Sequence, residues 1–377
     1  MQKEKIIQEL EELKNDNRFR TIKTNDKSLY NFSSNDYLGL AHDKDLLQKF
    51  YQNYSFDNYK LSSSSSRLID GSYLTVMRLE KKVEEIYKKP CLVFNSGFDA
   101  NSSVIETFFD KKSLIITDRL NHASIYEGCI NSRAKILRYK HLDVSALEKL
   151  LKKYSEDYDD ILVVTETVYS MDGDCAEIKK ICDLKDKYNF NLMVDEAHSY
   201  GVYGYGIAYN EKLIDKIDFL VIPLGKAGAS VSAYVICDEV YKNYLINKSK
   251  KFIYSTALPP VNNLWNLFIL ENLVNFQDRI EKFQELVTFS LSMLKKLNLK
   301  TKSTTHIISI IIGDNLNTVN LSNNLKELGY LAYAIKEPTV PKDTARLRIS
   351  LTADMKKEEI ETFFKILKAE MKKIGVI

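Results

Sequence analysis

The sequence predicts an α/β protein with a large domain, built on a mostly parallel sheet covered by helices, and a smaller α+β domain after it. Short apolar runs recur between about residues 79 and 236, helical patterns separate these runs, and a break follows at Leu258-Pro-Pro260. A chain of 377 residues is long enough to form both domains.

Residues 1–40 are expected to form an N-terminal helix and an arm. Ile6, Ile7, Leu10 and Leu13 recur at the spacing of one helix face. The segment that begins at Tyr30 is rich in turn formers, which indicates a strand that enters a loop.

Residues 41–260 are expected to form the large domain. Its strand candidates are almost entirely apolar, which is typical of strands covered on both faces. Helical patterns such as Val144–Tyr154 and Ala176–Tyr188 lie between them, and this alternation indicates parallel strands. In such sheets the chemistry gathers at the carboxyl ends of the strands. The strand candidates are Cys91–Phe94, Leu114–Thr117, Ile161–Thr165, Leu192–Asp195, Phe219–Ile222 and Ala233–Ile236.

Residues 261–377 are expected to form the smaller domain, which begins with a long linking helix over roughly residues 262–297. Strands at Ile307–Ile312 and Leu347–Leu351 and helices at Thr318–Leu328 and Met355–Ile374 give it an α+β composition. The apolar face of the last helix consists of Ile360, Phe363, Phe364 and Leu367.

Composition and charge exclude several classes of function. Charged residues make up 28% of the chain, and the net charge is only +3 from interleaved signs, so no nucleic-acid surface is indicated. The apolar runs are too short to cross a bilayer, and the N-terminus lacks the apolar core of a signal peptide. The five cysteines are odd in number and lack metal-ligand spacing. We therefore expect a cytoplasmic protein with reduced thiols, no metal, no nucleic acid and no membrane.

Two residues at the ends of predicted strands indicate the chemistry. Asp195 closes the apolar strand Leu192–Asp195. Lys226 follows the strand Phe219–Ile222 between small residues that let a planar ligand approach the backbone, and a desolvated lysine becomes an amine nucleophile. Taken alone, each is better explained as a turn residue.

Together, the two residues are more specific than either is alone. A pyridoxal-phosphate site needs a lysine for the Schiff base and a partner for the ring nitrogen, and an aspartate keeps that nitrogen protonated. Lys226 and Asp195 lie 31 residues apart, which fits one strand-to-strand connection. The sequence therefore predicts pyridoxal 5'-phosphate as the cofactor.

Longer motifs resemble the α-oxoamine synthases, a branch of the fold-type-I pyridoxal-phosphate enzymes. The resemblance runs from about Tyr30 to the C-terminal helix, with the motifs in the family's order. It implies a fold-type-I transferase that works as a homodimer with shared active sites. The matching stretches are Asn31–Leu40, Asn95–Asn101, Asp118–Ser124, Glu166–Asp174, Met193–Gly204, Leu224–Gly228, Ile253–Pro260 and Pro338–Ala353.

The resemblance implies roles for the residues that match these motifs. Lys226 would form the Schiff base and move the Cα proton, and Asp195 would pair with the pyridinium nitrogen. His122 would stack on the cofactor ring, while His198 and Ser170 would hydrogen-bond its phenolic oxygen.

The cofactor's phosphate is expected at a helix N-terminus. Gly97 and Phe98 follow the strand Cys91–Phe94, and the N–H groups and dipole of a helix that opens there suit a phosphate. By resemblance, Ser255 and Thr256 would reach the phosphate of the neighbouring subunit.

The amino acid's carboxylate is expected to bind an arginine. Arg348 matches the family's carboxylate-binding residue, and the planar guanidinium fork suits this role. Asn35 would contact the same carboxylate from the other subunit. We expect Arg346 and Arg348 to point to opposite faces of a strand, so that only Arg348 lines the site.

Several positions depart from the family's pattern. Pro223 stands where many relatives carry a threonine, and it offers neither a hydroxyl nor an N–H. The run Ser62–Ser66 replaces a glycine-rich stretch and restricts that loop, and Val76 stands where relatives often carry a histidine. The N-terminal arm matches weakly, so neither Arg18 nor Arg20 is assigned a role.

Within the family, the chain most resembles the branch that condenses L-alanine with a pimeloyl thioester in biotin synthesis, with coenzyme A or a carrier protein as the acyl carrier. The implied products are 8-amino-7-oxononanoate, carbon dioxide and free thiol. Another α-oxoamine synthase, such as one that joins glycine to acetyl-CoA, is the alternative. A non-catalytic scaffold subunit is a distant alternative, which the presence of Lys226, Asp195 and His122 disfavours.

Overall fold

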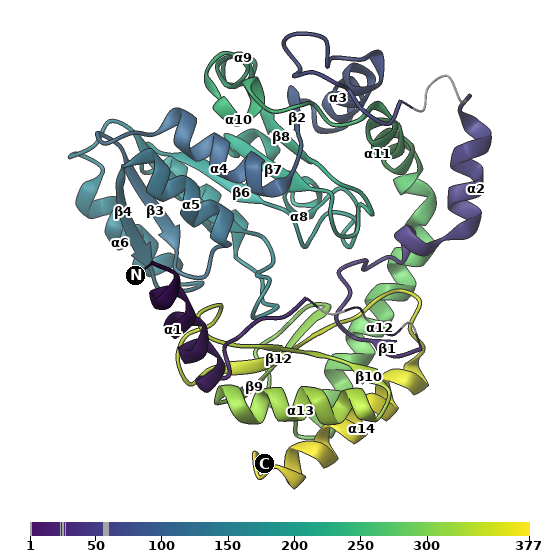
Figure 1. The fold of residues 1–377 in the computed structure, drawn as a ribbon. Coiled ribbons are helices and arrows are strands. Elements are labelled where there is room, and N and C mark those ends of the chain that lie inside the picture. The colour runs from purple at the N-terminus through teal and green to yellow at the C-terminus, as the bar shows by residue number, and fades with distance from the viewer. Residues whose placement is uncertain (1, 23, 25, 27, 56–59) are drawn as a thin grey trace. The chain divides into compact units, whose positions relative to one another are not determined.

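The computed structural model describes residues 2–22, 24, 26, 28–55 and 60–377 (Figure 1). The chain forms two compact units. Unit 1 comprises Met1–Tyr37, Ser170–Asp174 and Lys282–Ile377, and unit 2 comprises Leu38–Tyr169 and Cys175–Glu281. The domain limits predicted from the sequence, after residues 40 and 260, stay a prediction.

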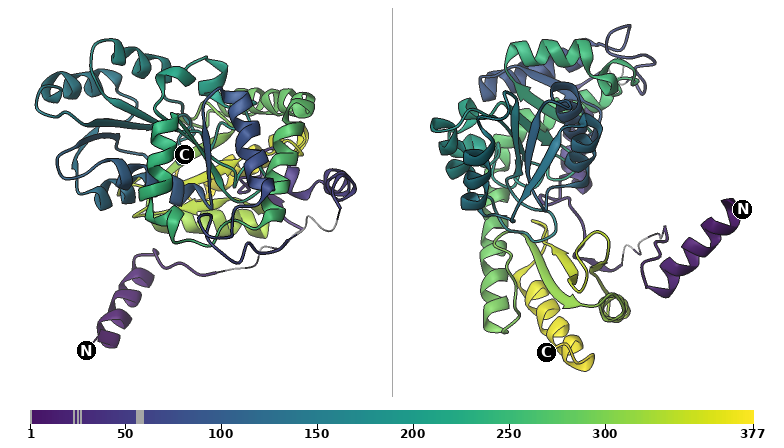
Figure 2. Two further views of the ribbon diagram at one scale, coloured as in Figure 1. Left: turned by 90° about the horizontal axis from the view of Figure 1, so that it is seen from above. Right: turned by 90° about the vertical axis from the view of Figure 1, so that its left-hand side faces the viewer.

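Unit 2 is built on a seven-stranded sheet with the strand order β2-β8-β7-β6-β5-β3-β4. Strands β3 to β7 pair in parallel, whereas β8 runs antiparallel to β2 and β7. Helices lie on both faces of this sheet (Figure 2), so the predicted α/β class with a mostly parallel, helix-covered sheet is confirmed. The strands are β2 (Cys91–Phe94), β3 (Leu114–Asp118), β4 (Lys135–Tyr139), β5 (Ile161–Glu166), β6 (Asn191–Asp195), β7 (Phe219–Pro223) and β8 (Ala233–Cys237).

Strand β4 was not predicted from the sequence. It lies at the edge of the sheet, where Lys135 and Arg138 are exposed. A strand with one open edge carries charged residues, and β4 therefore lacks the continuous apolar run that marks the buried strands.

The helices of unit 2 pack on the sheet and on one another. Helix α4 contacts β2, β7 and β8 and packs against α5. It begins after Ser96, whose Oγ accepts a hydrogen bond from the Asp99 N–H at 3.0 Å and so caps the helix. The helices are α2 (Lys44–Asn53), α3 (Leu74–Tyr87), α4 (Gly97–Phe108), α5 (Ala123–Ser132), α6 (Val144–Tyr154), α7 (Ile178–Asp183), α8 (Ile207–Asn210), α9 (Glu239–Lys248), α10 (Lys250–Ile253) and α11 (Pro260–Asn272).

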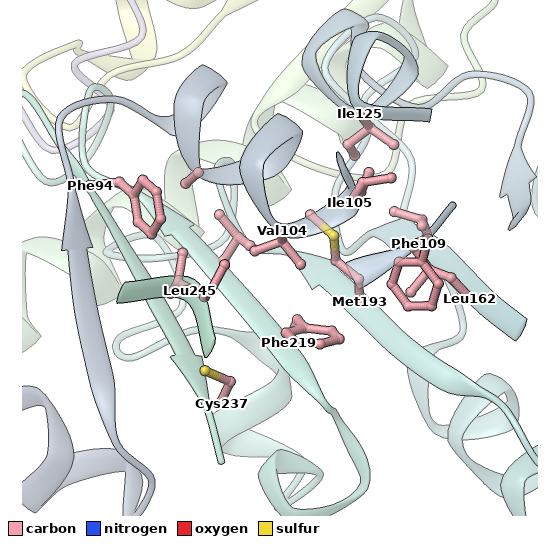
Figure 3. Close-up of a cluster of buried hydrophobic side chains, with 14 of the residues drawn as sticks. Phe94, Val104, Ile105, Phe109, Ile125, Leu162, Met193, Phe219, Cys237 and Leu245 are labelled. Carbon is pink, nitrogen blue, oxygen red and sulfur yellow. The ribbon is translucent and has the colours of Figure 1, made fainter. Parts of the chain in front are cut away.

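An apolar core joins α4 and α5 to the sheet. Val104 and Ile105 of α4 lie among strand residues such as Met193 and Phe219 (Figure 3). Burying an apolar side chain of this size contributes about 1.5–3 kcal/mol. This packing fixes the position of α4 against the strands whose carboxyl ends carry the candidate site residues.

The single helix predicted over residues 262–297 is wrong in one respect, because it is interrupted. Helix α11 ends at Asn272, and a 3₁₀ turn over Leu273–Phe276 precedes α12 (Gln277–Lys296). Leu273 is buried, so the apolar pattern continues through the turn and does not reveal the break.

Unit 1 contains a three-stranded antiparallel sheet, β11-β12-β9, and a two-stranded parallel pair, β1-β10. Helix α13 packs on these strands and on α14 (Figure 1). The predicted apolar face of α14 is buried, as expected. The elements are α1 (Gln2–Asn15), β1 (Tyr30–Asn31), β9 (Ile307–Gly313), α13 (Asn315–Glu327), β10 (Tyr330–Leu331), β11 (Tyr333–Ile335), β12 (Ala345–Ser350) and α14 (Lys357–Lys373).

The short segment Ser170–Asp174 belongs to unit 1, although the chain on both sides of it belongs to unit 2. The Gly173 carbonyl accepts hydrogen bonds from the Thr304 N–H at 2.9 Å and the Thr305 hydroxyl at 2.8 Å. Gly173 has φ +69°, and a Cβ there would lie 1.8 Å from the Ile307 carbonyl oxygen. Only glycine fits this turn.

Helix α1 forms as predicted, but none of its residues is buried. In the described part of the chain, every helix is too short or too polar to span a membrane.

Candidate functional site

Three polar residues of unit 2 lie at the carboxyl ends of neighbouring parallel strands. Glu166 ends β5 and Asp195 ends β6, and the two residues are paired in register. Lys226 follows β7, which pairs with β6. Both carboxyl groups are buried, at 2% and 3% exposure. This is the edge where parallel sheets place ligands.

The Asp195 carboxylate is held on both of its oxygens. Oδ1 accepts a hydrogen bond from the Ala197 N–H at 2.7 Å, and Oδ2 accepts one from Asn101 Nδ2 at 2.6 Å. A carboxylate with these two donors is fixed in direction before any ligand binds.

Asn101 also connects Asp195 to His122. Asn101 Nδ2 donates to Ser124 Oγ at 3.0 Å, and Ser124 Oγ lies 2.8 Å from His122 Nδ1. Because the Ser124 backbone N–H also donates to Nδ1, at 3.2 Å, the imidazole accepts at that atom. The network therefore favours a neutral His122 with its proton on Nε2.

The charge of Lys226 affects the pKa values of residues around Asp195. Burial lowers the pKa of His122, and the nearby charges of Asp195 and Lys226 raise and lower it respectively. Burial also raises the pKa of Glu166 well above its ordinary value; the Asp195 charge raises it further, while Lys226 and the His122 N–H oppose the rise. Asp195 and Lys226 thus act on the same two side chains. A protonated Glu166 avoids two adjacent buried negative charges.

The second acid of the motif, Glu196, points elsewhere. Its carboxylate accepts hydrogen bonds from the Ala208 N–H at 2.7 Å and the Ile207 N–H at 3.1 Å, at the start of α8. Burial raises the pKa of Glu196 to about 7. Glu196 therefore holds the loop before α8, and Asp195 is the acid that faces Asn101.

The start of α4 forms a cradle for an anion. Ser96 caps the N–H of Asp99, and among the described residues the N–H groups of Gly97 and Phe98 have no partner. A Cβ on Gly97 would lie 2.6 Å from Cβ of Pro223, so the proline ring packs directly on the glycine. Free N–H donors at a helix N-terminus suit a phosphate.

The serine run holds the segment that contains the predicted residues Ser255 and Thr256. Ser66 forms a β-bridge with Thr256, and Asn95 Nδ2 donates to the Thr256 carbonyl at 2.7 Å. Ser63 Oγ donates to the Ala257 carbonyl at 2.6 Å. Within this single chain, Thr256 therefore lies beside the residue that leads into the cradle.

In unit 1, Arg348 is buried and has no acidic partner among the described residues. Its Nε donates to the Ser170 carbonyl at 2.6 Å, Nη1 donates to Ser350 Oγ at 2.7 Å, and Nη2 lies 3.4 Å from the Tyr37 hydroxyl. All three acceptors are neutral. A buried guanidinium of this kind suits a carboxylate ligand.

Asn35 joins this group through Tyr37. The Tyr37 hydroxyl donates to Asn35 Oδ1 at 3.1 Å, so Asn35 and Arg348 are connected within one chain. Whether Asn35 contacts the amino acid's carboxylate from the other subunit stays a prediction.

The expectation that Arg346 and Arg348 point to opposite faces is wrong. Arg346 Nη1 donates to Asp172 Oδ1 at 2.7 Å, and Arg348 donates to Ser170, so both reach the segment Ser170–Asp174. Residues two positions apart on a strand share a face. The two arginines differ in charge balance instead, because Asp172 neutralises only Arg346.

Asp195, His122 and Lys226 were predicted from the sequence, whereas Asn101 and Glu166 were not. Both lie inside the motifs that matched the family, and Asn101 follows Gly97 by four residues on the same helix face. Their role depends on strand pairing and helix packing, which the motif spacing does not reveal. His198 is buried in the turn after β6 in unit 2, whereas Ser170 belongs to unit 1.

Comparisons with known proteins show the family of this chain. A model of the class I and II aminotransferase family matches residues 27–367. A protein of Pasteurella multocida (strain Pm70), provisionally named 8-amino-7-oxononanoate synthase, is 40% identical over 376 residues, covering 96% of this chain and 97% of that protein.

Two solved structures have the same fold. An 8-amino-7-oxononanoate synthase from Francisella tularensis is 28% identical, with a TM-score of 0.77 over 92% of this chain and 99% of that one. A serine palmitoyltransferase with pyridoxal phosphate is 25% identical, with a TM-score of 0.88 over 99% and 98% of the two chains. The fold-type-I prediction is confirmed.

Proposed function

The chain belongs to the class I and II aminotransferase family, and we propose that it is an acyltransferase that condenses L-alanine with a pimeloyl thioester. The products would be 8-amino-7-oxononanoate, carbon dioxide and free thiol. Pyridoxal phosphate is the cofactor. The observation that carries the substrate assignment is the 40% identity over 376 residues with a relative named for this activity.

The residues of unit 2 fit pyridoxal phosphate. The cradle at Gly97 has two unused N–H donors for a phosphate and would be filled by a Cβ. Asn101 Oδ1 is buried and, among the described residues, has no hydrogen-bond partner. Such an atom is satisfied when a ligand or water reaches it.

The proposed roles in unit 2 follow from these positions. Lys226 would hold the cofactor through Nζ and would move the Cα proton of the amino acid. By the family's motifs, Asp195 would pair with the ring nitrogen, His122 would stack on the cofactor ring, and His198 would hydrogen-bond its phenolic oxygen. Bound pyridoxal phosphate supplies an electron sink for the negative charge at Cα.

The proposed roles in unit 1 concern the amino acid. Arg348 binds the alanine carboxylate, because its buried charge is matched only by neutral acceptors. By the family's motifs, Asn35 would orient the same carboxylate, and Ser170 would serve the phenolic oxygen of the cofactor. Decarboxylation then releases the group that Arg348 held.

The direct test combines purified protein, pyridoxal phosphate, L-alanine and pimeloyl-CoA, with mass detection of the amino ketone. A parallel reaction uses a pimeloyl-carrier protein to identify the acyl carrier. We expect product in at least one reaction and none from Lys226→Ala, whereas Lys248→Ala, an exposed lysine on α9, should match the wild type. A cofactor-loaded protein that forms no product with either donor contradicts the proposal.

Serine palmitoyltransferase activity is the second candidate, because solved structures of that enzyme reach a TM-score of 0.88 with this chain. The same assay with serine and palmitoyl-CoA, and with glycine and acetyl-CoA, separates the candidates. If either of these reactions is faster than the one with L-alanine and pimeloyl thioester, its substrates are the better assignment.

We also propose that the protein is a homodimer in which Ser255 and Thr256 serve the phosphate site of the other subunit. Support comes from the resemblance of the segment Ile253–Pro260 to the family's motif. Light scattering of the purified protein should give the mass of two chains, and a monomeric mass with full activity would contradict the shared site.

A further inference from the structure

The loop that carries Lys226 has an unusual backbone. Residues 224–232 connect β7 to β8, and two of them, Ala229 and Ser232, have positive φ angles of 50° and 130° although neither is glycine. Such conformations are costly for residues with a Cβ and persist only where the surroundings determine them. Something must therefore hold this loop.

Hydrogen bonds inside the loop provide part of the restraint. The Leu224 N–H donates to the Ser232 carbonyl at 2.9 Å, and the Ser230 N–H donates back to the Leu224 carbonyl at 3.1 Å. The Ala229 N–H donates to the Lys226 carbonyl at 2.9 Å. The backbone of Lys226 is thus tied directly to one of the two strained residues.

Helix α11 provides the rest of the restraint through two adjacent side chains. Trp265 Nε1 donates to the Ala229 carbonyl at 2.8 Å. Asn266 Nδ2 donates to Ser232 Oγ at 2.9 Å and lies 3.4 Å from the Val231 carbonyl. One helix turn therefore contacts both strained residues of the loop.

Trp265 and Asn266 are themselves firmly held within unit 2. The Trp265 ring meets Phe50 edge-on with centroids 5.1 Å apart, and it also packs near Phe268 at 5.8 Å. Asn266 is only 1% exposed. A buried amide and an aromatic ring packed on two others have little freedom to follow the loop if it moves.

We propose that Trp265 and Asn266 are positioning residues that hold the Lys226 loop in the conformation that presents the lysine amine to the cofactor. This inference rests on the proposed role of Lys226. Each would act through the backbone that carries the amine, because the hydrogen bonds of both side chains go to the loop. Trp265 is also the only tryptophan in the chain, so the tryptophan emission comes from this side chain alone.

The test uses full-length Trp265→Phe and Asn266→Ala variants. Phenylalanine keeps an aromatic ring against Phe50 but removes the N–H donor together with part of the indole. Asn272→Ala is the matched control, because that amide on the same helix donates to the Phe268 carbonyl and not to the loop. The probe is pyridoxal phosphate, whose attachment to Lys226 is trapped with borohydride and located by peptide mass.

Three measurements decide the outcome. Loss of one hydrogen bond should slow cofactor attachment or weaken it by about 2- to 12-fold. Hydrogen exchange should become faster at residues 224–232 in both variants, with no change in the strand peptide 191–195. In Asn266→Ala, the Trp265 emission should shift and become easier to quench with iodide.

If Trp265→Phe has the same hydrogen-exchange rates and cofactor-attachment rates as the wild type, the inference is overturned, even if Asn266→Ala fails to fold. Borohydride trapping that misses Lys226 in the wild type refutes the proposed function instead. Trapping at Lys226 with unaffected variants refutes only the positioning role.

Discussion

Replacing Asn101 by alanine should weaken cofactor binding strongly. The substitution removes the 2.6 Å hydrogen bond to Asp195 and the 3.0 Å hydrogen bond to Ser124. A hydrogen bond to a charged group contributes about 1.5–3 kcal/mol, which corresponds to about 10- to 150-fold in affinity. The Asp195 carboxylate would lose one of its two fixed donors. Ser124, which contacts His122, would lose the hydrogen bond from Asn101 that orients its hydroxyl.

The assay is a titration of cofactor-free protein with pyridoxal phosphate, followed by Trp265 fluorescence. Asn101→Ala should bind about 10- to 150-fold more weakly. Asn131→Ala on α5 is the control, because that exposed amide donates to Glu106 and lies outside the network. Equal affinity of Asn101→Ala and wild type would refute the reasoning.

A second variant separates a positioning role from simple packing. Asn101→Asp keeps the volume of the side chain but places a carboxyl group against Asp195. If charge and donor direction matter, Asn101→Asp binds more weakly than Asn101→Ala. If Asn101 only fills space, the order is reversed, because alanine leaves the larger cavity.

Three further perturbations follow from the structure. Arg348→Lys should raise the KM for L-alanine by about 10-fold or more with a smaller change in kcat, since lysine cannot reproduce the planar fork; steady-state kinetics measure the split. Gly97→Ala should weaken pyridoxal phosphate in the same titration, because its Cβ would lie 2.6 Å from Pro223, and unchanged affinity would show that the cradle does not bind phosphate. Burial raises the pKa of Glu196 to about 7 from 4.5, so its contribution to stability is full below about pH 4.5 and is lost as the pH rises through 7, by about 3 kcal/mol. Glu196→Gln should flatten the fall in melting temperature between pH 5 and pH 7, and an unchanged slope would exclude Glu196 as its source.

The sequence was sufficient for the buried parts of the fold. Strands such as Cys91–Phe94 and the helix Val144–Tyr154 form within the expected limits, because continuous burial and helical periodicity leave a direct mark on residue type. The edge strand β4 was missed because its Lys135 and Arg138 face solvent. The 3₁₀ turn at Leu273–Phe276 was missed because its residues continue the apolar pattern.

The candidate site was predictable only in part. Asp195 ends one apolar strand and Lys226 follows another, and that position alone draws attention to them. Asn101 sits in a helix, and its importance comes from two acceptors, Asp195 and Ser124, that are distant in sequence. The different charge balance of Arg346 and Arg348 likewise depends on Asp172, which only the folded segment supplies.

The segment Ser170–Asp174 limits how this protein can be dissected or recombined. A fragment cloned from Lys282 onward would contain both arginines of β12 but not the Ser170 carbonyl or the Asp172 carboxylate that accept from them. Its two guanidinium groups would need water or new acceptors inside a folded core. In chimeras with relatives, these five residues and the C-terminal part should therefore come from the same parent protein.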